Sequence, residues 1–492
     1  MYGLDPDLAG VSRDTVHSLA VLMLAGLLAG CAAGPDFKQP AAPVVATYTV
    51  APTSEQMVSI ATALGGAQHL VEGAVIGDAW WHTLGSSQLD ALIDRALQAN
   101  PTLVSAQATL RQAQELYAAK SGATRYPQVD AGINAQRQRF NPGALGQAGE
   151  AREFGLYSAS IGVHYQLDLA GGNRRALEAL AARTDYRRYQ LRGARLTLAA
   201  NIASTAVTQA RLAGQIQATD AMLQAQEEQL KLAHERVRLG QAAPDDVLAL
   251  QTQVEQTRAG LPLLRKQSQQ SEHLLAVLAG QAPGAGGLPS FTLEDFTLPP
   301  NLPLVVPSEL VRRRPDIQAA EALLQVANAE YGVAIARLYP QINLSANLGS
   351  QALSTAALFG GGSVIWSLVG QLTQPLFNPG LPAEKRAALA AFDAAAANYQ
   401  SVVLESLRNV ADILGALDND AQRLNALATA DAAAQGSVQS MQRQYRLGAT
   451  SYIQLLTAQQ QAQQNRINLV AGQAERLVDS IAWYQAMGGT GS

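Results

Sequence analysis

Two kinds of hydrophobic periodicity alternate along the chain. Residues 86–123 and 309–338 carry apolar side chains at helical spacing, which predicts a helix opening each half of the sequence. From residue 158 the period becomes two, and apolar positions alternate with polar ones. This alternation predicts a strand at about 158–168, and the same pattern predicts strands at about 128–138, 341–350 and 364–374. Each predicted strand has one apolar face and one polar face.

Long helical stretches follow both strand pairs. From Gly172 to about Arg238, and from Pro382 to about Arg446, the sequence is rich in Ala, Gln, Leu and Arg and has no proline after the first turn. Each stretch predicts a helix of about 65 residues, or ~100 Å. A Leu-Gly turn and a shorter returning helix come next, at 245–279 and 451–487. We expect the opening helix of each half to stack on the return and complete the antiparallel partner.

The sequence contains an internal repeat. NPTLVSAQATLRQAQELYAA aligns with RPDIQAAEALLQVANAEYGV and pairs Pro101 with Pro315. RVRLGQAAPDDVLALQ aligns without a gap with QYRLGATSYIQLLTAQ. We therefore expect a first repeat at 80–280 and a second at 308–488, joined by a Gly/Pro-rich connector at 281–307 that cannot be helical.

The alternating strands favour a membrane barrel over a soluble sandwich. Small polar residues on one face suit a wet lumen, and the apolar residues on the other face suit lipid. No segment after the amino-terminal region has the apolar length of a transmembrane helix. Four strands cannot close a barrel, and lipid does not tolerate an open sheet edge, so the chain must oligomerise. A dimer and a trimer both satisfy this requirement.

The amino-terminal region has the features of a lipoprotein export signal. The apolar run from Leu19 to Gly30 is too short to span a bilayer and suits the core of a signal peptide. It ends in Leu-Ala-Gly-Cys, which resembles the bacterial lipobox, and Cys31 is the only cysteine of the chain. We expect residues 1–30 to be a lipoprotein signal peptide, Cys31 to carry the lipid, and residues 31–79 to form an anchored, extended segment. The alternative is an ordinary signal peptide with a chance cysteine.

Composition narrows the classes of function. The 492-residue chain is 48% hydrophobic but only 5% aromatic. Its net charge of −4 gives no sign of the basic surface that nucleic-acid-binding proteins have. We therefore expect no nucleic-acid partner and interpret the run from Arg312 to Arg314 as scattered or capping charge. The six histidines are dispersed without an HExxH motif, and no glycine cluster precedes the Lys of a phosphate loop. The sequence predicts no enzyme activity, no cofactor and no metal site.

Three segments carry a family resemblance. CAAGPDFKQP begins at Cys31, DAWWHTLGSSQLDALIDRALQANPTL begins at Asp78, and VPSELVRRRPDIQAAEALLQVANAEYGVAIARLYPQINL, the most specific, runs from Val306 to Leu344. On these segments the chain resembles the outer-membrane factor family of TolC-like channels. Within the family it is similar to the lipoprotein branch that includes OprM and the NodT-type proteins. The resemblance covers nearly all of the mature chain.

The resemblance implies an architecture and a function. It implies an α+β membrane protein that forms a homotrimer, whose twelve-stranded outer-membrane β-barrel, four strands per chain, continues into a long periplasmic α-helical barrel. The function would be that of the outer-membrane channel of a tripartite efflux system, a passive conduit for small molecules such as drugs. The implied partners are a periplasmic adaptor (membrane fusion) protein, an inner-membrane transporter of the RND type, and outer-membrane lipids. Two alternatives stay open: the exit duct of a type I protein-secretion system and a non-conducting periplasm-spanning tether.

The resemblance also assigns the turns between the long helices and their returns. They would be the periplasmic tips on which the adaptor docks, and their glycines permit a left-handed turn. The residues are Arg238, Leu239 and Gly240 in the first repeat, and Arg446, Leu447 and Gly448 in the second.

In the family, acids and arginines near the tips close the resting channel. The acids here are Asp245 and Asp246, whereas the second repeat has Thr450, Ser451 and Tyr452 where related channels often carry an aspartate. The candidate gate therefore comprises Asp245, Asp246, Thr450 and Tyr452. The alternative for Asp245 is that it caps the returning helix.

Overall fold

The structure is a computed structural model that describes residues 33–50, 56–74, 76–146 and 148–489. The chain divides into two compact units, which we describe one at a time. The first comprises Met1–Gln39, Arg111–Tyr186 and Glu321–Asn398, and the second comprises Pro40–Leu110, Arg187–Ala320 and Tyr399–Ser492. Each unit therefore combines segments of both sequence repeats.

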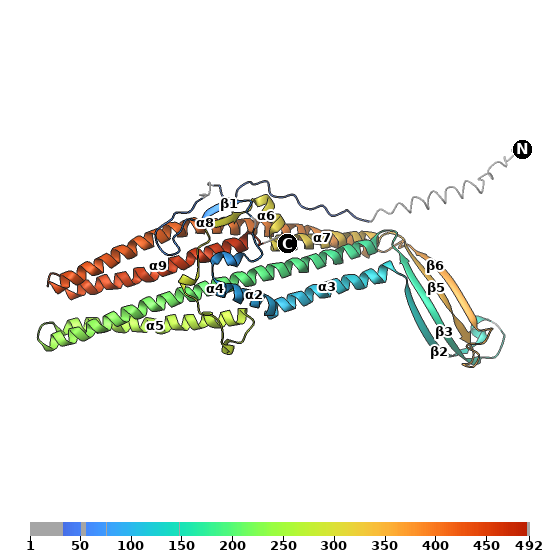
Figure 1. The fold of residues 1–492 in the computed structure, drawn as a ribbon. Coiled ribbons are helices and arrows are strands. Elements are labelled where there is room, and N and C mark those ends of the chain that lie inside the picture. The colour runs from blue at the N-terminus through green and yellow to red at the C-terminus, as the bar shows by residue number, and fades with distance from the viewer. Residues whose placement is uncertain (1–32, 51–55, 75, 147, 490–492) are drawn as a thin grey trace. The chain divides into compact units, whose positions relative to one another are not determined.

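The first unit contains a four-stranded antiparallel sheet (Figure 1). Its order is β2-β3-β5-β6, with β2 at Gln128–Phe140, β3 at Arg152–Leu167, β5 at Gln341–Ala352 and β6 at Val364–Thr373. A strand lies at each of the four predicted positions. β3 begins earlier than the alternation indicated, because its pairing with β2 continues to Phe140 and Arg152.

Long helices make up most of the remaining structure. The predicted long helices are α4 and α8, each of 67 residues, and the predicted returns are α5 and α9, each of 35 residues. The helices are α2 (Ser87–Ala99), α3 (Pro101–Arg125), α4 (Gly172–Arg238), α5 (Pro244–Leu278), α6 (Pro307–Arg313), α7 (Pro315–Ala336), α8 (Gly380–Arg446) and α9 (Tyr452–Ala486).

The opening helix of each repeat is interrupted, which corrects the prediction of one continuous helix at 86–123 and at 309–338. The breaks fall at Asn100 and Arg314, both of which have extended backbone. Each residue precedes a proline, and the proline ring disfavours the helical conformation of the residue before it. The sequence pairing of Pro101 with Pro315 thus corresponds to the same structural event in both repeats.

The connector and the amino-terminal segment also contain regular structure that the sequence did not indicate. β1 (His69–Glu72) pairs in parallel with β4 (Asn301–Leu304) in the second unit. β1 lies in the segment at 31–79 that was expected to be extended, and β4 lies in the connector at 281–307. The expectation that this connector cannot be helical was wrong at two short 3-10 helices, η3 (Pro283–Ala285) and η4 (Leu293–Asp295). Four-residue strands give too short a pattern to detect, and this pair is held by tertiary contacts such as the bond that Trp483 Nε1 donates to the Pro303 carbonyl at 2.7 Å.

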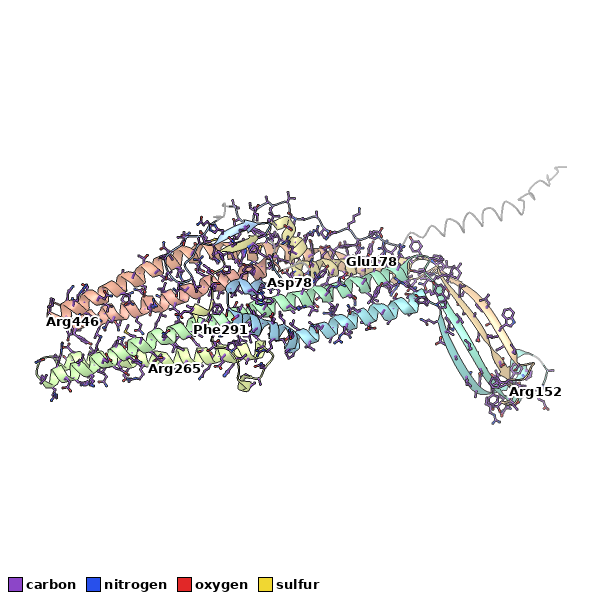
Figure 2. All side chains as sticks on the ribbon, viewed as in Figure 1. Asp78, Arg152, Glu178, Arg265, Phe291 and Arg446 are labelled. Carbon is purple, nitrogen blue, oxygen red and sulfur yellow. The ribbon has the colours of Figure 1, made fainter. Side chains whose placement is uncertain are left out.

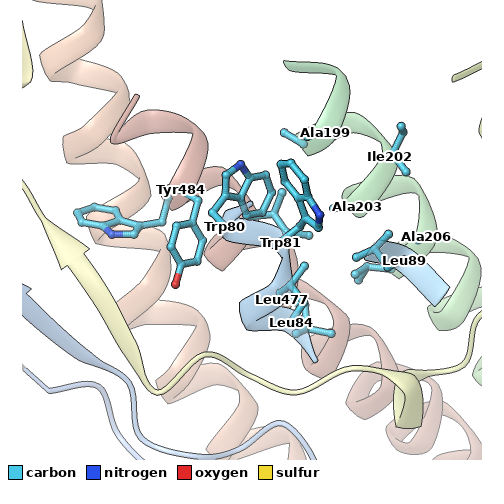
Figure 3. Close-up of a cluster of buried hydrophobic side chains, with 14 of the residues drawn as sticks. Trp80, Trp81, Leu84, Leu89, Ala199, Ile202, Ala203, Ala206, Leu477 and Tyr484 are labelled. Carbon is cyan, nitrogen blue, oxygen red and sulfur yellow. The ribbon is translucent and has the colours of Figure 1, made fainter. Parts of the chain in front are cut away.

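The core of the second unit lies where α2, α4 and α9 meet the short helix η1 (Trp80–Leu84) (Figure 3). Trp80 stacks on Tyr484 with ring centroids 5.3 Å apart, and Trp81 meets Trp80 edge to face. Small residues of α4, such as Ala203 and Ala206, are fully buried in this cluster. Their small size lets the aromatic rings of η1 approach the helix backbone closely.

A pair of equivalent junctions joins the opening and returning helices of each repeat. Asn100 Nδ2 donates to the Leu278 carbonyl at 2.8 Å, and Arg314 Nη1 donates to the Ala486 carbonyl at 3.0 Å. Both carbonyls lie at the last turn of a returning helix, where intrahelical partners are missing. The junctions agree with the expectation that each opening helix stacks end to end on its return.

Arg314 has further partners, so it is not a scattered charge, and its bond to the Ala486 carbonyl at the end of α9 agrees with the alternative that it caps a helix. Its guanidinium makes a bidentate pair with Asp316, at 2.8 and 3.1 Å, and donates to Asn409 at 3.2 Å. Burial opposes ionisation of Asp316, yet the Arg314 pair holds the pKa of this carboxyl below its usual value. The sequence of three consecutive arginines does not indicate that Arg314 is the one that contacts α7, α8 and α9.

Candidate functional site

The register of the sheet gathers most of the apolar side chains of the four strands on one face. Ala131 pairs with Ile161, Ile161 with Leu348, and Leu348 with Trp366. Because paired residues point to the same side, these form one apolar row, and neighbouring rows are built likewise. The side chains are exposed in the single chain, with Trp366 at 77%. The opposite face carries mainly polar or small side chains, with Asp130, Gly162, Asn347 and Ser367 in one row, and Ile365 and Val369 of β6 are apolar exceptions.

The sheet of a single chain is incomplete, because both of its edge strands lack a second neighbour and its apolar face is exposed. In the described residues β2 and β6 each pair on one side only. An exposed apolar sheet face with open edges is unstable in water and in lipid, unless further strands and an apolar environment complete it.

The two predicted turns have the geometry expected of them. Gly240 and Gly448 adopt φ values of 71° and 74°, the left-handed region that glycine occupies without strain. Each glycine ends a long helix and lets the chain reverse into the return. Leu239 and Leu447 are exposed at these turns, and Figure 2 labels Arg446 at the end of α8.

A side-chain tie connects the two turns within the second unit. Arg236 Nη1 donates to the Tyr445 hydroxyl at 2.6 Å, and its guanidinium lies 5.2 Å from the centroid of that ring. Tyr452 donates its hydroxyl proton to Gln229 Oε1 at 3.1 Å. The rings of Tyr445 and Tyr452 pack together with centroids 5.1 Å apart. Near the turns, the first hairpin is therefore bonded to the second at two points.

Tyr452 is the one predicted gate residue in this tie. Burial raises the pKa of Tyr452, and the neighbouring Tyr445 adds to the increase. The phenol therefore keeps its proton and remains a donor. Sequence reasoning missed Gln229, Arg236 and Tyr445, although two tyrosines flanking one turn stand out in a chain so poor in aromatic residues.

The remaining predicted gate residues lie apart from the tie. Asp245 and Asp246 are in the first turn of α5, whose N-cap is Ala243, so Asp245 is not the capping residue. Thr450 bonds to Gln454, and Ser451 is the N-cap of α9 in a capping box with the same glutamine. At the positions where related channels often carry an aspartate, the second repeat therefore has the first residues of α9 and its N-cap.

The amino-terminal segment is held on the first unit. Cys31 lies outside the described residues, which begin at Ala33. The Ala33 amide donates to the Ala170 carbonyl at 2.8 Å, just after β3 ends. The buried Arg175 donates to the carbonyls of Ala33 and Gly34 and pairs with Asp36 at 2.8 Å.

The described residues contain neither a candidate metal site nor a candidate membrane-spanning helix. In the part of the chain that the structure describes, no group of His, Cys, Asp or Glu side chains could hold a metal ion. Among the same residues, no helix combines the length and apolar character needed to cross a membrane.

Comparison with known proteins identifies the family. The family model described as "Outer membrane efflux protein" matches residues 92–281 and 306–489. The chain belongs to this family. The predicted resemblance to outer-membrane factors is confirmed, and the chain is an outer-membrane efflux channel.

Individual relatives in the outer membrane efflux protein family match over most of their length. "Outer membrane protein OprJ" of Pseudomonas aeruginosa is 27% identical over 480 residues, covering 97% of this chain and 96% of OprJ. "Pyoverdine export outer membrane protein OpmQ" of Pseudomonas putida is 31% identical over 425 residues, covering 83% and 87%. The solved structure of the outer-membrane channel OprN matches with a TM-score of 0.83 and 26% identity, covering 94% of this chain and 99% of OprN.

Proposed function

We propose that three copies of the chain form a passive exit channel for small molecules, with a twelve-stranded barrel in the outer membrane and a periplasmic helical barrel. The sheet, with one apolar face and two open edges, is the observation that carries this proposal. Closure with strands of further copies removes the edges, and lipid covers the apolar face. Three copies are what family membership implies.

The height of the apolar face supports a position in the bilayer. On β3, every apolar-face position from Tyr157 to Leu167 carries an aromatic or aliphatic side chain. These positions extend about 33 Å along the strand, or about 25 Å in height at a tilt of ~40°. That height equals the apolar band of outer-membrane barrels.

We also propose that Cys31 carries a lipid. The bond between Ala33 and Ala170 fixes the chain just after the end of β3, and Cys31 is two residues away. Two residues reach at most about 7 Å, so an acyl chain on Cys31 would enter the membrane beside the sheet. Replacement of Cys31 by Ser should abolish the incorporation of labelled palmitate, and undiminished labelling would contradict the proposal.

The two turns are the proposed docking points for a periplasmic adaptor, and the Arg236–Tyr445 and Tyr452–Gln229 pairs are proposed to hold the resting channel shut. In this mechanism the channel binds no cofactor and catalyses no reaction; an inner-membrane transporter of the RND type supplies the energy and selects the cargo. The names of three relatives mention antibiotics, toluene and pyoverdine, which supports a small-molecule cargo.

Conductance in planar lipid bilayers tests the proposal. The purified full-length chain should insert and conduct ions, with larger currents once the tie between the turns is removed. A chain that inserts but never conducts, even without the tie, would be a periplasm-spanning tether and not a channel. In cells, deletion of the gene should raise susceptibility to small toxic compounds, whereas loss of a secreted protein alone would indicate a type I secretion duct.

A further inference from the structure

The β2–β3 hairpin extends past the rest of the sheet at the end away from the helices. β2 pairs with β3 as far as Phe140 and Arg152, whereas the pairing of β3 with β5 ends at Tyr157 and Ala352. Residues 152–156 of β3 therefore lie beyond the end of β5, and Figure 2 labels Arg152 at this end of the sheet. In the proposed channel this end faces the cell exterior, because the helices leave the sheet at its opposite, periplasmic end.

The register places two arginines on the outward face of this hairpin, directly beyond the apolar band. Ala135 pairs with Tyr157, the outermost apolar residue on that face of β3. Further along β2 on the same side come Arg137, which pairs with Gly155, and then Arg139. Because alternate residues of a strand point to one side, both arginines continue the row of lipid-facing side chains.

Both arginines lie at the height of lipid headgroups. Arg137 and Arg139 follow Ala135 by two and four residues, or about 7 and 13 Å along the strand. At a tilt of ~40° they lie about 5 and 10 Å above the apolar band. The headgroup layer extends roughly 5–8 Å beyond the hydrocarbon core of a bilayer. Long arginine side chains that start at these heights reach the lipid phosphates.

A tyrosine borders the two arginines at the upper limit of the apolar band. A Cβ built on Gly155 would lie 3.1 Å from Cε2 of Tyr157 and 3.5 Å from its hydroxyl oxygen, so the ring extends along the strand over the glycine. The hydroxyl therefore lies near the level of Arg137, which pairs with Gly155. A tyrosine with its polar end directed away from an apolar band is typical of a membrane interface.

One carboxylate shares this face with the two arginines. Glu153 is opposite Arg139 in the register, and it lies 3.4 Å from Arg137 Nη2. Both side chains of that ion pair are exposed, so water weakens the pair and it contributes little. Two guanidinium groups against one carboxylate leave this face with a net positive charge, which a second anion would balance.

The second hairpin of the sheet lacks such charge. Residues 341–373, which comprise β5, β6 and the loop between them, contain no Asp, Glu, Lys, Arg or His. When Pro127 is aligned with Pro340, the counterparts of Arg137 and Arg139 on β5 are Ser350 and Ala352. The outer end of a strand in this sheet therefore does not require arginine, and the positive surface occurs once in each copy.

We propose that Arg137 and Arg139 bind the phosphate groups of lipopolysaccharide, the phosphorylated glycolipid of the outer leaflet. This inference rests on the proposed position of the sheet in the outer membrane. Guanidinium groups bind phosphate oxygens through paired, charge-assisted hydrogen bonds. The acyl chains of the same molecule lie against the apolar band below. The two arginines are about 7 Å apart on one strand face, which suits a lipid that carries more than one phosphate.

Titration of the purified full-length chain with lipid A tests this surface. Bis-phosphorylated lipid A is added in detergent, and bound lipid is counted by native mass spectrometry. EDTA is present, so that no divalent cation bridges Glu153 to a phosphate. The double variant Arg137→Gln with Arg139→Gln should bind at least about tenfold more weakly than the wild type. Arg152→Gln is the matched control, because it removes a charge from the same hairpin but pairs with Phe140 on the opposite face.

Two further lipids identify the group that is bound. Monophosphoryl lipid A, which has one phosphate fewer, should bind the wild type at least about threefold more weakly than the bis-phosphorylated form. Phosphatidylglycerol should bind the wild type and the double variant equally weakly. If phosphatidylglycerol binds the wild type as tightly as lipid A does, the ligand is a phospholipid phosphate and the assignment to the glycolipid is wrong.

Conductance of the same preparations in planar bilayers separates this inference from the channel itself. A double variant that conducts like the wild type but has lost affinity for lipid A supports the inference. If the wild type conducts and the double variant binds lipid A as tightly, or if Arg152→Gln loses as much affinity, the inference is wrong while the proposed function stands. A wild-type chain that never conducts overturns the proposed function and, with it, the membrane position on which this inference rests.

Discussion

Removal of the tie between the two turns is a sharp test of how the resting channel is closed. Tyr445→Phe removes the hydroxyl that accepts from Arg236, and Tyr452→Phe removes the donor to Gln229. Both rings stay in place, so their packing at 5.1 Å is retained. The double variant therefore loses two hydrogen bonds and little else.

The free energy lost with the two hydrogen bonds depends on how exposed the bonded groups are. A hydrogen bond contributes about 1 kcal/mol net, and one from a charged donor about 1.5–3 kcal/mol. Arg236 is exposed and water replaces part of its bond, so the lower end applies to it. We expect a total of about 2 kcal/mol in each copy, which shifts the ratio of closed to open turns in that copy roughly thirtyfold.

Single-channel recording measures this ratio directly as the open fraction at low voltage. Because the proposed channel contains three copies, each single variant should raise it at least about fivefold, and the double variant at least about thirtyfold. Arg238→Gln is the matched control, because Arg238 lies beside the same turn and pairs with Glu235 of its own helix. If the double variant opens no more often than the wild type, or if Arg238→Gln opens as often as the double variant, the tie does not hold the channel shut.

Four further variants test the packing and electrostatics of the second unit. Gly488→Ala, at φ 87° with a Cβ 3.1 Å from the Arg314 backbone, should destabilise by about 2–3 kcal/mol in thermal unfolding, whereas Gly240→Ala, which meets nothing within 4 Å, should cost about 1 kcal/mol. Arg314→Lys should lower the unfolding temperature by several degrees, because lysine cannot replace a bidentate pair; an unchanged temperature would contradict this. Burial and a hydrogen bond with Asp420 raise the pKa of Asp479 to about 8. The folded chain then holds this proton up to that pH while the unfolded chain releases it near pH 4, so stability should fall between pH 4 and 8, and less steeply in Asp479→Asn.

The elements with long, uninterrupted patterns could be predicted from the sequence. The ends of α4 and α8 follow from stretches without proline that stop at Arg-Leu-Gly, and the strands follow from alternation over ten or more residues. Both signals are local, because a helix face or a strand face is set by spacing along the chain. The breaks before Pro101 and Pro315 were also encoded locally, in the restriction that proline places on the residue before it.

The contacts between distant segments could not be predicted. β1 and β4 pair across most of the first repeat, and their four residues carry no pattern of their own. Arg236 and Tyr445 meet only because the two hairpins lie together in the second unit, and neither residue belongs to a motif. Family analogy offered Asp245, Asp246, Thr450 and Tyr452 as candidate gate residues, but nothing in the sequence indicated that Tyr452 bonds to Gln229.

The repeat also indicates where the helical ends can separate. At the junctions, both repeats keep the same bond, from Asn100 in one and from Arg314 in the other. At the turns the tie is not repeated, because the counterparts of Tyr452 and Gln229 are Pro244 and Ser437, and proline has no side-chain donor. The two hairpins of one chain are thus bonded at their turns by a pair that the other repeat cannot supply at the counterpart positions. An adaptor that docks at the turns would therefore have to break this pair in each copy before the two hairpins of that copy separate.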